Sequence, residues 1–378
     1  MKNNKNKKIC ILTSAHSAFD IRIFHKQAKT LVSVGYDVTL IAQHNKNEIV
    51  DGVKIIALPK PQNRFYRIFF FTKKVYKIAL AQKTDVYHFH DPEFLPWALL
   101  LRLKTRAKII YDSHEDVPKQ ILSKKWVPRF LRFPISIFFN FIEKQITRNF
   151  DAVIAVTPAV ADKFLAPQKI YLANYPKLKY FNLLSSRSKQ RNNPKKFTII
   201  YAGGLTRIRG IKEIIEAYGL LLSNYPIRFK LAGNFSEKEF ESEIKKNVIW
   251  KKIDYLGFLP LSAVYQHFAT ADIGLICLLP EPNYIDSSPN KMFEYMAAGL
   301  PVVASHFPAW KKIIEENQCG LCVDPNNPRT IAKAIEYLVQ NPDKAKEMGE
   351  NGKMAVKQKY NWNIEERKLL NLYEDLIK

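Results

Sequence analysis

The stretch Asp286-Ser-Ser-Pro-Asn-Lys-Met-Phe-Glu-Tyr-Met-Ala-Ala-Gly-Leu-Pro-Val-Val303 carries start and stop signals for one helix. Ser288 is a good N-cap, and Pro289 suits the first helical position. Gly299 suits the C-terminal stop, and Pro301 prevents the helix from continuing into the apolar residues that follow. The sequence therefore predicts a helix of about ten residues followed by a buried strand.

The N-terminus of this helix has the properties of an anion site. Its first backbone N–H groups have no partner within the helix, and the helix dipole adds partial positive charge. Lys291 adds a full charge beside Asn290, and Glu294 follows about one turn later, where its carboxylate could accept hydrogen bonds from a ribose. We therefore expect a nucleotide phosphate here. The alternative is a purely structural helix before a buried strand, which is common in α/β proteins.

Length and charge indicate two domains of unequal character. The chain has 378 residues, and this length exceeds what one hydrophobic core usually supports. Its hydrophobic content of 47% is enough for a large buried core. Residues 1–190 hold 33 Lys and Arg against 13 Asp and Glu, so they carry +20 of the total formal charge of +24. Such asymmetry suggests that the first half faces an anionic membrane or a nucleic acid. We expect no nucleic acid, because no RNP, helix-turn-helix or zinc-finger signature is present. A generally basic proteome is the other explanation.

The cysteines and the apolar runs exclude several other classes. Cys10, Cys277, Cys319 and Cys322 are too few and too scattered for a disulfide framework, and Cys319-Gly-Leu-Cys322 lacks a second pair for a zinc site. The apolar run Ile9–Leu12 is too short for a signal-peptide core, and no run approaches ~20 residues. We therefore expect a protein that does not span a membrane.

Short apolar strands alternate with amphipathic helices throughout the chain, as in parallel sheets covered by helices. This alternation stops in a polar, irregular segment and restarts at Phe197–Ala202. The sequence predicts an α/β protein with two Rossmann-like domains facing across a cleft. The expected divisions are an N-terminal domain at 1–176, a linker at 177–196, a C-terminal domain at 197–360 and a helix at 361–378 that crosses back to the N-terminal domain.

A second phosphate-oriented segment, Tyr201-Ala-Gly-Gly-Leu-Thr-Arg-Ile-Arg-Gly210, follows the first strand of the second domain. Gly203 and Gly204 let the backbone approach a ligand closely, and the guanidinium of Arg209 matches diphosphate oxygens. The structural alternative is a glycine turn with solvated arginines. We expect this segment to bind the same nucleotide as the helix at 286–303.

Together the two segments resemble the retaining glycosyltransferases of family 4, which have the GT-B fold. The resemblance rests on Asp286 and Glu294, which are separated by seven residues before an Ala-Gly-x-Pro-Val-Val turn, and on the glycine-rich segment at the family's spacing. The family has Glu where this chain has Asp286, and a first basic residue where it has Gly204. The residues that the resemblance assigns to nucleotide or donor binding are Gly203, Gly204, Arg209, Phe258, Asn290, Lys291 and Glu294.

The loop after the first strand carries His16, Asp20 and Arg22, at a place where open α/β sheets bind ligands. Family members with sugar acceptors show a similar Asp-x-Arg-Ile stretch, so the resemblance implies that these three residues position the acceptor. The alternative is that Asp20 and Arg22 merely pair with each other.

Two further strands of the first domain also end in polar residues. His90, Asp91 and Glu93 resemble acceptor-side residues, and His114 matches the family's cleft histidine, which approaches the donor sugar. Imidazoles and carboxylates are costly to bury without partners or a function. A metal ion held by His88, His90 and His114 with an aspartate is the minor alternative. The resemblance implies transfer with no metal and no cofactor besides the nucleotide sugar.

The resemblance also implies a reaction. A sugar would pass from a nucleoside-diphosphate donor of the UDP or GDP type with retention at the anomeric carbon. His114, Asp286 and Arg209 are the expected catalytic residues, with Arg209 and the helix terminus at Asn290 and Lys291 stabilising the leaving diphosphate. The expected acceptor is a glycan or lipid-linked glycan of surface polysaccharide or lipopolysaccharide synthesis. The alternatives are a catalytically silent nucleotide-sugar-binding protein and another GT-B enzyme, such as an epimerase or a phosphorylase.

Two segments of the basic half, 64–74 and 124–139, interleave cations with aromatic residues. Such segments can lie in an anionic lipid interface, with rings inserted and cations near head groups. The alternative is that the aromatic residues belong to the core and the cations are solvated. We expect a cytoplasmic protein, peripheral on the inner face of the cytoplasmic membrane, with the nucleotide sugar, the acceptor and an anionic membrane surface as partners.

Overall fold

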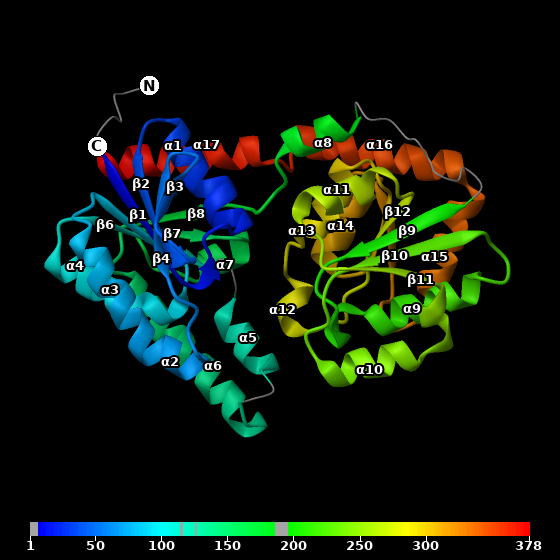
Figure 1. Cartoon of the computed structure of the whole chain (residues 1–378), viewed down its shortest axis with the longest axis horizontal. Helices are drawn as coiled ribbons and strands as arrows, with labels where there is room; N and C mark the ends of the chain where they lie inside the picture. The colour runs from blue at the N-terminus through cyan, green and yellow to red at the C-terminus, as the bar shows by residue number, and fades with distance from the viewer. Residues whose placement is uncertain (1–6, 114–115, 125–126, 186–195) are drawn as a thin grey trace. The chain divides into compact units, whose positions relative to one another are not determined.

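In a computed structural model, the chain forms two compact units, each built on a single sheet (Figure 1). The structure describes residues 7–113, 116–124, 127–185 and 196–378. Unit 1 comprises Met1–Asn174 with Ile364–Lys378, and unit 2 comprises Tyr175–Asn363. The α/β class and the two Rossmann-like domains predicted from the sequence are confirmed.

Unit 1 contains an eight-stranded sheet in the order β3-β4-β2-β1-β5-β6-β7-β8. All neighbouring strands are parallel except the edge pair β3–β4. β5 and β7 are buried along their whole length, as expected for strands covered on both faces. The strands are β1 (Lys8–Ser17), β2 (Asp37–Gln43), β3 (Glu48–Val50), β4 (Val53–Leu58), β5 (Val86–Phe89), β6 (Lys108–Ser113), β7 (Ala152–Ala155) and β8 (Gln168–Tyr171).

The helices of unit 1 cover both faces of this sheet. One face carries α3, α4 and α6: Val75 and Ala98 belong to one core cluster, and Ile146 of α6 packs against it. The helical segments are η1 (Ile21–Ala28), α1 (Lys29–Ser33), α2 (Arg64–Tyr66), η2 (Arg67–Phe71), α3 (Thr72–Ala81), η3 (Pro92–Phe94), α4 (Leu95–Lys104), α5 (Val117–Ser123), α6 (Arg129–Thr147), α7 (Pro158–Asp162) and α17 (Trp362–Ile377).

Unit 2 contains a six-stranded parallel sheet in the order β11-β10-β9-β12-β13-β14. Its strands are β9 (Phe197–Ala202), β10 (Ile227–Ala232), β11 (Ile253–Gly257), β12 (Ile273–Ile276), β13 (Val302–Ser305) and β14 (Gly320–Val323). Its helical segments are α8 (Leu178–Ser185), η4 (Arg207–Arg209), α9 (Ile211–Leu221), α10 (Lys238–Lys246), η5 (Val248–Lys252), α11 (Leu261–Ala269), α12 (Pro282–Ile285), α13 (Asn290–Ala297), α14 (Pro308–Glu316), α15 (Pro328–Gln340) and α16 (Pro342–Gln358).

Helix α8 departs from the expected irregular linker at 177–196. The ring of Phe181 packs against Tyr265 of α11, with centroids 4.6 Å apart, so an apolar contact stabilises a helix at the start of this polar segment. Residues 186–195 lie outside the described part of the chain.

Each sheet has a reversal point, which is a pair of neighbouring strands from which the chain continues toward opposite edges of the sheet. In unit 2, β9 and β12 are neighbours, but the chain passes from β9 to β10 on one side and from β12 to β13 on the other. In unit 1, β1 and β5 are related in the same way. Open α/β sheets bind ligands at the carboxyl ends of such strand pairs. The loops after β9 and β12, and those after β1 and β5, are therefore the places to look for a site.

The C-terminal helix α17 belongs to unit 1 although it follows unit 2 in the sequence. Its Glu365 accepts a hydrogen bond from the backbone N–H of Ala173 at 2.7 Å. Its Tyr373 hydroxyl lies 2.8 Å from Nδ1 of His88, in the centre of the sheet, and both side chains are fully buried. Polar contacts in the interior thus fix α17 to the first unit.

We expect Tyr373→Phe to lower the free energy of unfolding by about 1 kcal/mol, because a buried imidazole nitrogen loses its partner. Urea denaturation measures the change. Tyr337→Phe is the control, since Tyr337 is 43% exposed. Equal stabilities of the two variants would contradict the importance of this buried hydrogen bond.

Candidate functional site

Helix α13 begins one residue later than the sequence predicted. Pro289, and not Ser288, occupies the N-cap position, because Pro289 has an extended backbone with ψ of 120°. No side chain caps the helix, so its first N–H groups are left to a ligand or solvent. The predicted stop is correct. Gly299 has φ of +75° and donates to Met296 O, while Leu300 donates to Tyr295 O, both at 3.0 Å, which is a Schellman motif.

Glu294 is held rigidly within the first turns of α13. Its side chain is buried, Oε1 accepts from the hydroxyl of Tyr265 at 3.3 Å, and Oε2 accepts from Nζ of Lys291 at 3.0 Å. Burial and the Glu294 charge raise the pKa of Tyr265, so its phenol stays a proton donor. A carboxylate has about four acceptor sites, so Glu294 can still accept bonds from ligand hydroxyls.

Arg209 lies against the glycine turn after β9. A Cβ added to Gly203 would lie 3.2 Å from Nη1 of Arg209 and 3.2 Å from the hydroxyl of Tyr201, and Gly204 faces the same guanidinium. Burial lowers the pKa of Arg209, but Tyr201 and Tyr284 raise it by more, so the net shift is upward. The guanidinium therefore carries a permanent charge beside an accessible backbone turn.

Gly210 joins this turn to the end of β12. With φ of +67°, it approaches so closely that an added Cβ would lie 1.9 Å from the carbonyl oxygen of Cys277. Leu279 N–H also donates to Ile208 O at 3.0 Å. The loops that follow the two strands of the reversal point are therefore in direct contact, and Arg209 is placed where they meet.

The other two expected donor residues are accessible. Phe258 follows β11 and its ring is 74% exposed. Asp286 is the C-cap residue that follows α12, and it is also exposed. The loop between Asp286 and α13 is anchored by Trp310, whose Nε1 donates to Ser287 O at 2.7 Å.

Sequence patterns did not point to the aromatic residues that orient this site, namely Tyr201, Tyr265, Tyr284 and Trp310. Tyr265 and Trp310 donate to Glu294 and Ser287 on distant segments, so no spacing along the chain indicated them. Tyr201 instead donates to Gly204 O, three residues further along the same turn.

In unit 1, His16 stands between two of the other predicted acceptor-side residues. Its Nε2 lies 3.9 Å from Oδ1 of Asp91, and its Nδ1 lies 3.5 Å from Oδ2 of Asp20. Asp91 is 3% exposed and accepts from the hydroxyls of Thr13 at 3.0 Å and Ser14 at 3.1 Å. The structure thus gathers these residues at the carboxyl ends of β1 and β5.

Glu93 extends this cluster. It accepts from the hydroxyl of Ser14 at 3.3 Å, and its Oε1 lies 2.8 Å from Nε of Arg67 on η2. Burial and then the charge of Asp91 raise the pKa of Glu93, although Arg67 partly opposes this shift. Glu93 therefore holds a proton more readily than an ordinary glutamate.

Asp20 and Arg22 do not pair through their side chains, so that alternative is wrong. Asp20 caps η1 by accepting from the backbone N–H groups of Arg22 and Ile23 at 2.8 and 2.9 Å. The guanidinium of Arg22 is 5% exposed and binds both oxygens of Asp112, each at 3.0 Å, and Leu172 O at 3.0 Å. This geometry favours a structural role for Arg22 over acceptor contact.

His88, His90 and Asp112 are the group that the described residues offer for a metal ion, with ligand atoms within 4.8 Å of one another. Asp112 already binds Arg22 and accepts from Nε2 of Gln27 at 2.6 Å. Burial raises the pKa of Asp112, but Arg22 and the two histidines lower it by more, to well below its usual value. A cation would have to displace the guanidinium, so the donor set suits a buried ion pair better than a metal.

His114 lies outside the described residues, and its expected approach to the donor sugar stays a prediction.

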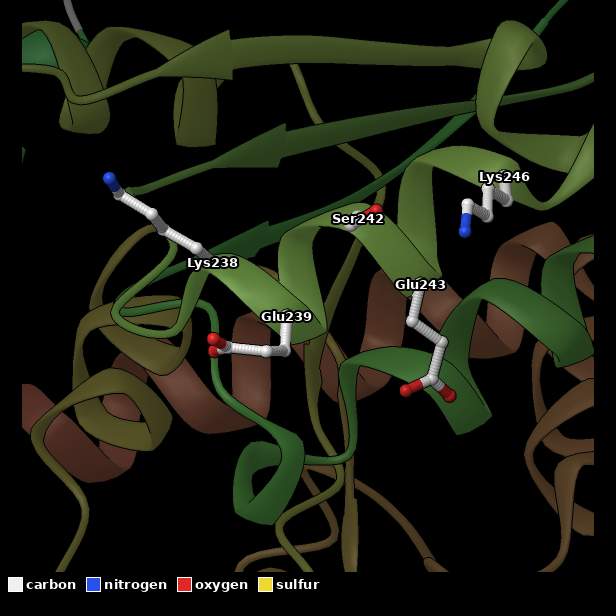
Figure 2. A pocket seen from close by; sticks show the side chains of 5 residues that line it. All are labelled: Lys238, Glu239, Ser242, Glu243 and Lys246. Atoms are coloured by element: carbon white, nitrogen blue, oxygen red, sulfur yellow. The ribbon is translucent and has the colours of Figure 1, made fainter.

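Figure 2 shows a surface depression that is lined by one helix only. Its side chains, Lys238, Glu239, Ser242, Glu243 and Lys246, all come from α10. Glu243 is already paired with Arg207 and, at 3.3 Å, with Lys212. This depression shares no residue with the predicted donor and acceptor sites, and we assign it no ligand.

Two family models match the chain in succession. The model described as Glycosyltransferase Family 4 matches residues 22–172, in unit 1. The model described as Glycosyl transferases group 1 matches residues 185–355, in unit 2. Together with the fold, these matches define a glycosyltransferase of the GT-B type.

Individual relatives agree with this class at low identity. An uncharacterized glycosyltransferase of Haemophilus influenzae is 22% identical over 346 residues, which cover 88% of this chain and 90% of the relative. Sucrose-phosphate synthase of Thermosynechococcus elongatus has a similar structure, with a TM-score of 0.79 and 18% identity, covering 98% of this chain and 99% of its own. HepE of Anabaena, solved in complex with UDP-glucose, gives a TM-score of 0.72 and 16% identity, covering 97% and 99%.

Gly210→Ala tests the contact between the two loops of the donor side. We expect it to destabilise the protein by about 3 kcal/mol, because the new methyl group overlaps the Cys277 carbonyl in addition to the cost of a positive φ. Gly35→Ala is the matched control, since Gly35 also has a positive φ but has no atom within 4 Å of its added Cβ. Thermal or urea unfolding of both variants measures the difference. Equal losses would show that the Cys277 contact is relaxed in solution.

Asp20 gives a pH-dependent prediction. Burial raises the pKa of Asp20, but His16 and the two backbone donors lower it by more, so the folded value lies below the unfolded value of about 3.9. Its charge therefore stabilises the fold above pH ~4, and this contribution is lost as the pH falls toward the folded pKa. We expect Asp20→Asn to cost about 1 kcal/mol at pH 5 and less at pH 3. A cost that is the same at both values, measured by urea denaturation, would contradict this sign.

Proposed function

We propose that the protein transfers a sugar from a nucleoside-diphosphate sugar to a glycan or lipid-linked glycan, with retention of the anomeric configuration, as in family 4. The observation that carries this proposal is the position of Arg209. Its guanidinium lies against the Gly203-Gly204 turn at the β9–β12 reversal point, and unit 2 also supplies the uncapped N-terminus of α13. These are two groups suited to a diphosphate.

In this proposal each donor-side group has one task. Arg209, Lys291 and the N-terminus of α13 stabilise the charge that develops on the leaving diphosphate as the glycosidic bond breaks. Glu294 accepts hydrogen bonds from the ribose hydroxyls. Tyr265 and Lys291, which donate to its two oxygens, hold the carboxylate in position for these bonds. Asp286 contacts the donor sugar. His114 approaches the same sugar, as the resemblance implies.

The acceptor side belongs to unit 1. His16, Asp91 and Glu93 offer an imidazole and two carboxylates, which suit the hydroxyl groups of a saccharide. The Asp91 carboxylate is fixed by Thr13 and Ser14, so the acceptor meets a preformed set of partners. The hydroxyl proton passes to the leaving phosphate, as in the resembling family, and transfer needs no metal.

The donor is of the UDP or GDP type. HepE of Anabaena has been solved with UDP-glucose and with UDP, and a trehalose-6-phosphate structure from E. coli contains UDP-2-fluoro glucose. These proteins share the fold of this chain, which supports the choice of donor class. We assign the reaction to surface polysaccharide or lipopolysaccharide synthesis at the inner face of the cytoplasmic membrane.

Thermal-shift titrations with UDP-, GDP-, ADP- and dTDP-sugars test donor binding. We expect one of these nucleotide sugars to stabilise the protein. Glu294→Gln should weaken the binding of that nucleotide sugar about tenfold, because the ribose loses a charged acceptor. Glu316→Gln is the control, since the Glu316 side chain is 56% exposed on α14. An unchanged affinity in Glu294→Gln would remove the ribose role.

Turnover assays separate transfer from the alternatives. Release of nucleoside diphosphate that strictly requires an acceptor, with an α-linked product from an α-linked donor, supports retaining transfer. Donor conversion without acceptor indicates an epimerase. Donor binding with no turnover on any glycan indicates a silent binding protein.

A further inference from the structure

Helix α6 presents most of its large apolar side chains outward. Its exposed large hydrophobic residues are Phe130, Leu131, Phe133, Ile135, Ile137, Phe138 and Phe141, with Phe130 78% and Phe138 67% exposed. Its buried residues are instead Ser136, Glu143 and Thr147. Helices at the surface of a soluble protein normally show the reverse pattern. Such an apolar face marks an interaction site.

A second group of exposed rings lies on α2 and η2, which lead directly into α3. Phe65, Phe69 and Phe70 are 66%, 58% and 59% exposed, and the rings of Phe65 and Phe69 are 4.7 Å apart. Because α3, α4 and α6 pack at one core cluster, these helices cover the same face of the unit 1 sheet (Figure 1). Leu103 of α4 is 73% exposed on this layer. We call the outer surface of 64–81, 95–104 and 129–147 the aromatic-basic face.

The charges on this face have one sign. The three segments contain ten Lys and Arg and a single acidic residue, Glu143. Glu143 is fully buried, and its Oε2 lies 3.1 Å from Nζ of Lys163. The aromatic-basic face therefore offers cations and rings to its surroundings, with no exposed carboxylate of its own.

We propose that the aromatic-basic face docks on an anionic lipid bilayer, with the rings in the interface and the cations at the head groups. A second copy of the chain would oppose cations to cations. A nucleic acid would leave the aliphatic residues Leu131, Ile135 and Ile137 without stacking partners. None of the described helices is long and apolar enough to cross a bilayer.

The aromatic-basic face adjoins the acceptor cluster. Arg67 of η2 is paired with Glu93, which accepts from the hydroxyl of Ser14, and the backbone N–H of Ser14 donates to Asp91. If the proposed function holds, the acceptor hydroxyl is therefore received next to the lipid surface. The acceptor class that fits is a saccharide carried on a membrane lipid.

Co-sedimentation of the full chain with vesicles tests the docking. We expect binding to phosphatidylcholine vesicles that contain phosphatidylglycerol, and little binding to phosphatidylcholine alone. Phe133→Ser with Phe138→Ser should weaken binding about tenfold, because two inserted rings are lost. The control is Ile49→Ser with Val248→Ser, at residues 73% and 78% exposed outside this face.

A charge-reversal pair tests the electrostatic part. Lys73→Glu with Lys74→Glu should weaken binding to the anionic vesicles about tenfold. Lys251→Glu with Lys252→Glu, another exposed adjacent pair on η5, should leave it unchanged. Wild-type binding by both aromatic-basic-face variants would overturn the proposal, and so would self-association through this face without vesicle binding. Unchanged thermal unfolding of the variants shows that they are folded.

Turnover assays with two forms of the acceptor test whether the acceptor is carried on a membrane lipid. Phe133→Ser with Phe138→Ser should slow turnover of a lipid-linked acceptor in vesicles and leave turnover of its water-soluble counterpart unchanged. Equal slowing of both would overturn the link to the membrane. Donor thermal shifts report on the proposed function separately, so loss of vesicle binding with retained donor binding removes only the docking surface.

Discussion

In unit 2, two neighbouring parallel strands, β9 and β12, send their connections to opposite sides of the sheet, and the proposed donor site depends on this constraint. The loops after these strands must meet above the sheet, and Gly210 lets them meet at the distance of direct backbone contact. That contact fixes the turn that carries Arg209. The same arrangement of β1 and β5 gathers His16 and Asp91 in unit 1. In each unit, the order of the strands in the sheet therefore determines where the polar cluster lies, whatever side chains occupy the loops.

Features that depend on neighbours in the chain could be predicted from the sequence. The end of α13 followed from Gly299 and Pro301, and the strand–helix alternation gave the two sheets. The start of α13 differed by one residue, because proline is equally compatible with the first helical position and with the extended residue before it. The helix at Leu178–Ser185 was missed because its stabilising partner, Tyr265, lies on a distant element.

Features that depend on distant partners could not be predicted. Arg22 looked like an acceptor residue, but its partner Asp112 is separated from it by 90 positions and buries it. The sequence of 124–139 was compatible with aromatic residues in the core and with aromatic residues on the surface. Only the packing of α6 decides this, since it turns Ser136 and Glu143 inward and leaves most of the rings exposed. Once that orientation is known, ten of the 33 Lys and Arg of the first half belong to the three segments of the aromatic-basic face.

The return of α17 to unit 1 also affects how the chain folds during synthesis. The sheet of unit 1 is translated first, but the helix that covers His88 and accepts from the N–H of Ala173 is translated after the whole of unit 2. Domains usually fold in the order in which they leave the ribosome. Here the earlier domain cannot complete its fold until the later one has been synthesised. Until then, the polar groups that α17 covers in the folded protein stay exposed to solvent. The first unit to begin folding is therefore the last to be completed.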